Sequence, residues 1–287
     1  VARATTTVSF TATASGAPVV ASGAQVREVG GTRTYAATQG GSGFTASVDL
    51  TQLVAAGETK AVSLDAVVMD EAGNKGVASA TQAQVDDTAP VIAWVNEGQF
   101  YKIGPGAQVS VTVTDAGAGV NATSVQAVVT GGGGGACTAA GGNTYTCTIG
   151  TGSLANTATT LGYEVRAQDV LGKAGTKAAT LHVDGLGPEV SIAADSGFHA
   201  AGEAVTLDVT LADDGAGTAE TPAPTLQFAT VSGPVLSGTR VSGNTFRFGP
   251  MTASALVPGL AGRTGVDVVA RVTTQDVVGN ETVNEAA

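Results

Sequence analysis

The sequence predicts an all-β protein made of β-sandwich domains in tandem, and three observations carry this prediction. Glycine supplies 41 of the 287 residues, against a usual share of ~7%, which indicates frequent turns. Valine and threonine, which favour strands, are abundant, whereas leucine is scarce. Strand-like runs recur about every 8 to 12 residues between Gly-Gly, Gly-Asn or Pro-Gly pairs, a spacing typical of two packed sheets.

A strand that runs into an aspartate turn occurs three times, at 67–74, 165–173 and 272–280. The repeated aspartates are roughly 100 residues apart, which is the size of a domain. A second repeated phrase, at 85–92 and 183–190, ends one strand, passes through an Asp-Pro junction and begins another. Proline supplies no amide to a continuing ladder, so we interpret both phrases as short linkers.

We therefore expect three domains, 1–87, 88–185 and 186–287. The second and third open with an extra strand, near 91–95 and 190–193, which the first lacks. The first domain should consequently have an unpaired sheet edge, and the third should end inside its repeat. Residues 50–56 are expected to form one short helical turn.

The pairing of Asp-x-x-Gly-Asn turns with a later Val-Asp-x-Thr-x-Pro linker resembles the bacterial immunoglobulin-like repeats of large surface and secreted adhesin-type proteins. The resemblance spans essentially the whole chain, although Lys173 replaces the usual Asn and the linker 184–188 has no Thr. It implies immunoglobulin-like sandwiches in an extended rod, outside a bacterial cell. The implied partners are other domains of the same or neighbouring chains, and a cell-surface receptor or glycan.

The acidic residues at the turns and junctions have two interpretations. An aspartate that opens a turn can accept the turn's own amides, with Gly73, Gly172 and Gly279 at the fourth position. This structural interpretation is the favoured one, and no cofactor is then required. The alternative is Ca²⁺, which binds about six to eight oxygen ligands. Its candidate ligands are Asp70, Asp86, Asp87, Asp169, Asp184, Asp213, Asp214 and Asp276.

Cys137 and Cys147 are the only cysteines, and Gly142 lies midway between them. If this stretch folds as a hairpin, the two cysteines face each other and suit a cross-strand disulfide. Two free thiols are the alternative. A disulfide would indicate an oxidising, extracytoplasmic compartment.

The remaining features exclude several function classes. A net charge of −11 without clustered Lys or Arg argues against nucleic acids and anionic membranes. The uncharged stretch 116–163 is interrupted by polar residues well short of the ~20 apolar residues that a membrane helix needs. His182 and His199 stand in no motif with a nucleophile, so we expect no enzyme.

Three functions follow from these observations. The leading one is a non-enzymatic stalk, spacer or adhesive module of a bacterial extracellular protein or appendage. The second is a fibre or sheath subunit joined by strand donation, with 281–287 as the donor. The third is a carbohydrate-binding module of a secreted enzyme, with Trp94, Phe100 and Tyr101 as the sugar platform, although packing of Trp94 in the core is favoured.

Overall fold

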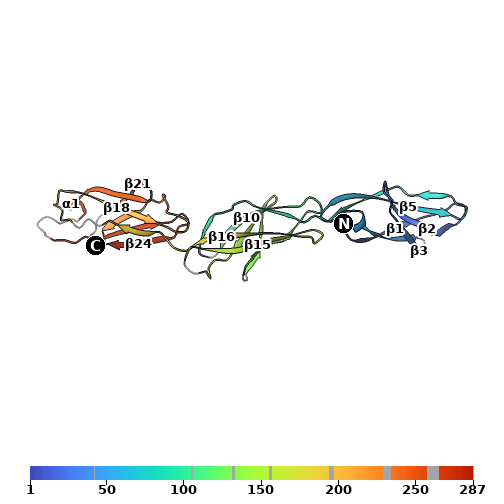
Figure 1. Ribbon diagram of the computed structural model, residues 1–287, viewed down its shortest axis with the longest axis horizontal. Coiled ribbons are helices and arrows are strands. Elements are labelled where there is room, and N and C mark those ends of the chain that lie inside the picture. Colours follow the sequence, from blue (N-terminus) through green and yellow to red (C-terminus); the bar gives the residue numbers. More distant parts are fainter. Residues whose placement is uncertain are drawn as a thin grey trace.

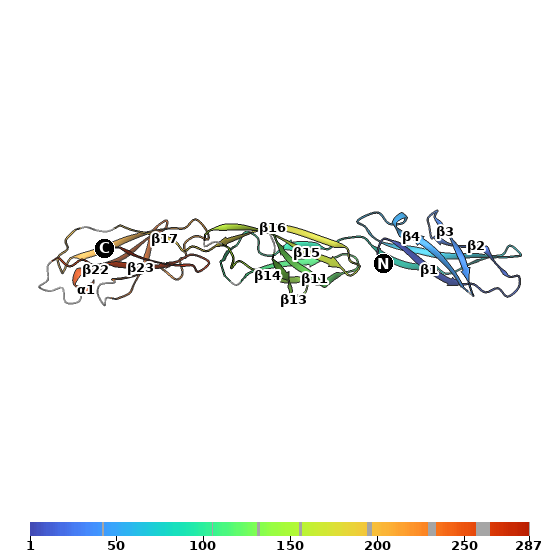
Figure 2. The same ribbon diagram turned by 90° about the horizontal axis from the view of Figure 1, so that it is seen from below.

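The computed structural model describes residues 1–41, 43–104, 106–130, 133–154, 157–193, 197–228, 234–256 and 265–286. Three β-sandwiches follow one another lengthwise and form an extended rod (Figures 1 and 2). The predicted all-β, immunoglobulin-like architecture is thus confirmed. Three separate hydrophobic cores lie within 24–85, 92–183 and 190–272. We call the three units domain 1, domain 2 and domain 3.

Domain 1 is one connected arrangement with the strand order β1-β4-β3-β2-β5-β6, and β7 also pairs with β5. Its β3 links the two layers because its first half pairs with β2 and its second half with β4. The elements are β1 (Thr5–Thr11), β2 (Val19–Glu28), β3 (Thr34–Gly40), β4 (Gly43–Asp49), the 3-10 helix η1 (Leu50–Gln52), β5 (Thr59–Asp70), β6 (Lys75–Val77) and β7 (Thr81–Asp86).

Domain 2 has two sheets, ordered β13-β14-β10-β8 and β12-β11-β15-β16-β9. All pairs are antiparallel except β9 with β16, which is parallel. The strands are β8 (Val91–Trp94), β9 (Phe100–Lys102), β10 (Ala107–Thr114), β11 (Val120–Val129), β12 (Gly134–Ala136), β13 (Thr138–Gly141), β14 (Thr144–Ile149), β15 (Thr159–Asp169) and β16 (Ala174–Asp184).

Domain 3 repeats this plan with the sheets β17-β18-β22-β21 and β20-β19-β23-β24. Residues 281–286, part of the expected donor segment, pair with β23 inside their own domain, while Ala287 lies outside the described residues. The elements are β17 (Glu189–Ile192), β18 (Ala204–Ala212), β19 (Thr225–Phe228), β20 (Leu236–Ser237), β21 (Thr239–Ser242), β22 (Thr245–Thr252), α1 (Ala253–Leu256), β23 (Ala270–Gln275) and β24 (Glu281–Ala286).

Alternation of side chains places the cores between the sheets. Along β10, Val109, Val111 and Val113 are buried, whereas the intervening side chains are more exposed.

The expected disulfide joins Cys137 to Cys147, whose Cα atoms are 4.2 Å apart. Cys137 lies where the chain passes from β12, in one sheet, to β13, in the other. No helix among the described residues is long and apolar enough to cross a membrane.

The strand β1 of domain 1 has fewer partners than β10 and β18, the strands that correspond to it in domains 2 and 3. In domains 2 and 3, β10 and β18 each lie between two strands, with β8 and β17 on their outer edges. In domain 1, β1 pairs with β4, and no described strand lies along its other edge.

Candidate metal centres at the two domain junctions

The three repeated aspartates begin turns of the same kind. The amide of Gly73 donates to the carbonyl of Asp70 at 3.0 Å, and the other two turns repeat this bond at 3.1 and 3.2 Å. Gly73, Gly172 and Gly279 have φ of 82°, 90° and 85°, which glycine adopts without steric cost.

The turn carboxylates differ in how fully they are hydrogen-bonded. In domain 3, Oδ1 of Asp276 accepts from the backbone amide of Asn280, and Oδ2 accepts from its side chain. Asp70 makes the same two bonds in domain 1. In domain 2, Lys173 stands in place of the asparagine, so only its backbone amide binds Asp169. Oδ2 of Asp169 is buried and has no hydrogen-bond partner among the described residues.

A second aspartate lies in the loop that follows β10 or β18. Oδ1 of Asp115 accepts from the amides of Gly117 and Gly119, at 3.0 and 2.8 Å. Asp213 makes the corresponding bonds in domain 3, at 3.0 and 2.7 Å. Oδ2 of Asp115 is buried and is also without a hydrogen-bond partner in the described part of the chain.

A third aspartate ends the last strand of the preceding domain and reaches across the junction. Oδ2 of Asp86 accepts from the amide of Ala118 at 2.5 Å. Its other oxygen accepts from Thr59 and Thr88. Burial opposes ionisation of Asp86, but these hydrogen bonds outweigh it and hold the pKa of the carboxyl well below its usual range. The second junction repeats the contact, because Oδ2 of Asp184 accepts from an amide of domain 3 at 2.7 Å.

Glycine makes this close approach feasible. A Cβ atom at Gly117 would lie 2.1 Å from Cγ of Asp86, and one at Gly215 would lie 2.1 Å from Oδ2 of Asp184. Both glycines occupy the third position of an Asp-x-Gly-Ala-Gly sequence. The loop sequence is thus adapted to a carboxylate that arrives from the neighbouring domain.

These contacts bring three carboxylates together at each junction. The first triad is Asp86, Asp115 and Asp169, and the second is Asp184, Asp213 and Asp276. In each triad, one oxygen of every residue lies within 4.8 Å of the others. Two members of each triad are buried, with exposed fractions of 5% or less, and the loop aspartate is half-buried. One residue comes from the preceding domain and two come from the following domain.

Each triad gathers three carboxylates with no basic side chain paired to them among the described residues. Burial raises the pKa of Asp276, and the negative charges of Asp184 and Asp213 act in the same direction. Among the described residues, no salt bridge reaches any of the six carboxylates. A donor set made only of carboxylate oxygens fits a hard cation such as Ca²⁺. The two unpartnered oxygens in the first triad are available as ligands.

The structure places five of the eight aspartates proposed from the sequence in these triads. The other three lie elsewhere. Asp70 is half-buried and hydrogen-bonded within its own turn, and Asp214 is exposed. Asp87 bonds the Lys173 ammonium at 2.6 Å and the amide of Gly57, and these bonds hold its pKa below the usual value. Asp115 was missed as a ligand, although it opens the same Asp-x-Gly-Ala-Gly sequence as Asp213.

Among the described residues of domain 1, no such triad lies at its outer end, the end away from domain 2. The turn aspartates pair with Val19, Val120 and Thr218. Five residues before these partners lie Ala14, Asp115 and Asp213, respectively. An alanine therefore occupies the position of the loop aspartate in domain 1.

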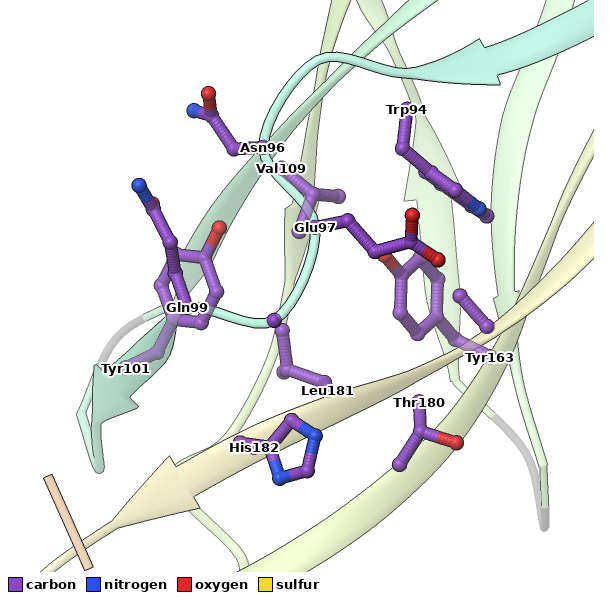
Figure 3. Close-up of a pocket in the computed structure, with 12 residues that line it drawn as sticks. Trp94, Asn96, Glu97, Gln99, Tyr101, Val109, Tyr163, Thr180, Leu181 and His182 are labelled. Atoms are coloured by element: carbon purple, nitrogen blue, oxygen red, sulfur yellow. The ribbon is translucent and has the colours of Figure 1, made fainter.

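The expected sugar platform is divided between two sides of a hollow in domain 2 of about 310 Å³. Trp94 and Tyr101 lie on opposite sides of it (Figure 3). The ring of Trp94 packs edge-on against Tyr163, with 5.3 Å between centroids, and burial raises the pKa of Tyr163 to about 12. Phe100 packs on His182 instead. The aromatic rings do not form one exposed row, so this arrangement gives no support to a glycan site.

Comparisons with known proteins complete this description. No protein-family profile and no curated protein match the chain. A tetra-tandem repeat in the extending region of a large adhesion protein is 19% identical to this chain. The match covers 98% of this chain and 69% of that protein's chain, with a TM-score of 0.36. The I9-I11 tandem of titin is 10% identical to this chain. The match covers 99% of this chain and 93% of the titin tandem, with a TM-score of 0.40. Fibronectin(III)-like modules of Clostridium thermocellum CbhA are 15% identical, with coverages of 64% and 87% and a TM-score of 0.30. At these values, the likeness assigns no role to any residue.

Proposed function

We propose that this chain is a non-enzymatic stalk or spacer of a bacterial extracellular repeat protein, in which Ca²⁺ at each junction fixes one domain against the next. The observation that carries the proposal is the recurrence of one aspartate triad at both junctions, with members from both adjoining domains. A single ion that binds both domains would oppose bending and rotation at the linker. The disulfide fits the proposed extracellular location.

Mutual repulsion explains why the triads need an ion to act as a link. Three carboxylates held within 4.8 Å of one another repel, and this repulsion pushes the adjoining domains apart. A divalent cation reverses the sign of the interaction, because each carboxylate is then attracted to the shared charge. Strand donation is less favoured as the function, because the described part of the proposed donor already pairs with β23.

Thermal unfolding of the 287-residue chain tests the calcium sites. We expect EGTA to lower the melting temperature and excess Ca²⁺ to restore it, since Ca²⁺ at a hundred times its Kd stabilises the bound state by about 2.7 kcal/mol per site. The double variant Asp115→Asn/Asp213→Asn should lose most of this response. Each asparagine retains an oxygen for the loop amides but removes a charge from its triad.

Asp70→Asn is the matched control, because Asp70 begins the same kind of turn but belongs to neither triad. It should respond to EGTA and Ca²⁺ as the parent chain does. A melting temperature that is the same in EGTA and in Ca²⁺ would disprove the calcium sites, as would an unchanged response in the double variant.

A further inference from the structure

We propose that the hollow in domain 2 is a binding site for a quaternary ammonium group, such as the trimethylammonium group of choline. The hollow has a volume of about 310 Å³, which is at the lower end of the range for small-molecule sites. Residues of β8, β9, β10, β15, β16 and the segment 96–99 line it. None of these lining residues belongs to a triad, so the proposal does not depend on calcium at the junctions.

Three aromatic rings from three different strands form the walls of the hollow. Trp94 and Tyr163 lie on one side, and Tyr101 lies on the other (Figure 3). The face of an aromatic ring is electrostatically negative, and it attracts a cation that lies within about 6 Å of the ring centroid. A quaternary ammonium group suits such walls, because its methyl groups pack on the rings and it has no N–H donor that needs a partner.

Glu97 adds a negative charge to these walls. Its side chain extends from the segment 96–99 toward Trp94 and Tyr163 (Figure 3). Burial raises the pKa of Tyr163 to about 12, and the neighbouring Tyr101 and Glu97 act in the same direction. The residues that line the hollow include neither lysine nor arginine. The hollow therefore favours a cation over an anion.

The hydroxyl of Tyr101 indicates a second feature of the ligand. It is buried and has no hydrogen-bond partner among the described residues. Buried hydroxyl groups are normally hydrogen-bonded. Choline and phosphocholine both carry an oxygen atom two carbon atoms from the nitrogen, and this oxygen can supply the missing hydrogen bond.

The corresponding positions of domains 1 and 3 lack these rings. Tyr163 lies six residues before a turn aspartate, and Leu64 and Ala270 occupy that position in the other two domains. Trp94 lies four residues after a junction proline, where domain 3 has Ile192. The same sandwich thus forms with aliphatic side chains at these positions. Packing alone does not require the aromatic rings of domain 2, whereas a cation site does.

Titration with choline chloride tests the site in the intact chain. Trp94 is the only tryptophan, so its fluorescence reports on the hollow directly. At constant ionic strength and constant Ca²⁺, we expect a single-site saturation curve with a Kd of about 1 mM or lower. The neutral analogue of choline, in which a carbon atom replaces the nitrogen, should bind at least about tenfold more weakly. Absence of saturation, or equal binding of the two compounds, would overturn the proposal.

Two variants test the location, with calorimetric titration as the measurement. Glu97→Gln changes an exposed side chain and should weaken choline binding by about two- to fivefold without unfolding the domain. Glu164→Gln is the matched control, because Glu164 pairs with Arg166 and does not line the hollow. It should bind choline as the parent chain does. Equal affinities of Glu97→Gln and Glu164→Gln would show that the site is wrong.

Tyr163→Leu introduces the residue that domain 1 has at this position, and it should weaken binding at least about tenfold. A thermal unfolding curve establishes whether this variant is folded, and if it is not, Glu97→Gln decides alone. A folded Tyr163→Leu chain that binds choline as tightly as the parent chain would also overturn the proposal.

Phosphocholine and vesicles of phosphatidylcholine identify the source of the ammonium group. Tighter binding of phosphocholine, together with sedimentation of the chain with the vesicles, would assign the site to a lipid headgroup. Binding of choline without such sedimentation would assign it to a free amine. Both results support the proposed site and differ only in where its ligand comes from.

Discussion

A single residue position distinguishes the three aspartate turns. Asn74, Lys173 and Asn280 occupy it, but only Asn280 is buried, with an exposed fraction of 6%. Its side-chain amide donates to Oδ2 of Asp276 at 2.6 Å and, across the junction, to the carbonyl of Asp184 at 3.1 Å. Asn280 therefore contributes both to its own turn and to the contact between domains 2 and 3.

We predict that Asn280→Ala lowers the free energy of unfolding of domain 3 by about 1 to 3 kcal/mol, because it leaves buried acceptors without donors. Asn74→Ala removes the same turn contacts at an exposed position and should cost about 0.5 kcal/mol or less. Urea denaturation of both variants and the parent chain measures the difference. Equal losses in the two variants would contradict the role of burial.

For single residues, the sequence predicts contacts between positions that are close together in the chain. The positions of Cys137, Cys147 and the turn glycines predict contacts between residues close in the chain, and the structure contains those contacts. The sequence could not assign Asp115, which was missed as a ligand, or Asp87, which was proposed as a ligand but lies outside the triads. Which aspartates converge depends on how one domain packs on the next, and no short sequence pattern contains that information.

Among the elements, the disulfide of domain 2 joins β14 to the point where the chain passes from β12, in one sheet, to β13, in the other. The cysteines are 10 residues apart, and Cys147 is fully buried. Loop-closure entropy for such a loop gives a stabilisation of about 2 to 3 kcal/mol. We predict that replacing both cysteines with alanine lowers the melting temperature of domain 2. Calorimetry of the variant and the parent chain checks this, with the transitions of domains 1 and 3 as internal controls that should not move.

The sequence predicts the elements that repeat better than those that do not. Comparison of the three units indicates β8 and β17, and both strands form. The expected helical turn at 50–56 is shorter, a 3-10 helix at Leu50–Gln52. The change of sheet within β3 was not foreseen, because it depends on pairing with two other strands and has no signature in the residues themselves.

For the whole molecule, the triads predict a rod whose stiffness depends on Ca²⁺. Small-angle X-ray scattering in Ca²⁺ should fit one extended shape, and EGTA should reduce the mean radius of gyration because the junctions then bend. Asp115→Asn/Asp213→Asn should give the EGTA profile in both conditions. Superimposable profiles of the parent chain with and without Ca²⁺ would contradict this expectation.

The rod itself could be predicted from the sequence because its repeat has the length of a domain and its linkers are short. The relative placement of the domains could not. It depends on contacts such as Lys173 with Asp87 and Lys102 with the carbonyl of Gly279, which join residues 86 and 177 positions apart.

Ala14 limits the effect of Ca²⁺ on stiffness to the two junctions between domains 1, 2 and 3. The outer end of domain 1 presents a methyl group where domains 2 and 3 present a carboxylate toward their preceding neighbours. A domain stacked on that end would meet only one of the two chelating side chains that the other junctions receive from the following domain. Calcium would then make domains 1 to 3 move as one body, and that end of domain 1 would remain a swivel at every calcium concentration.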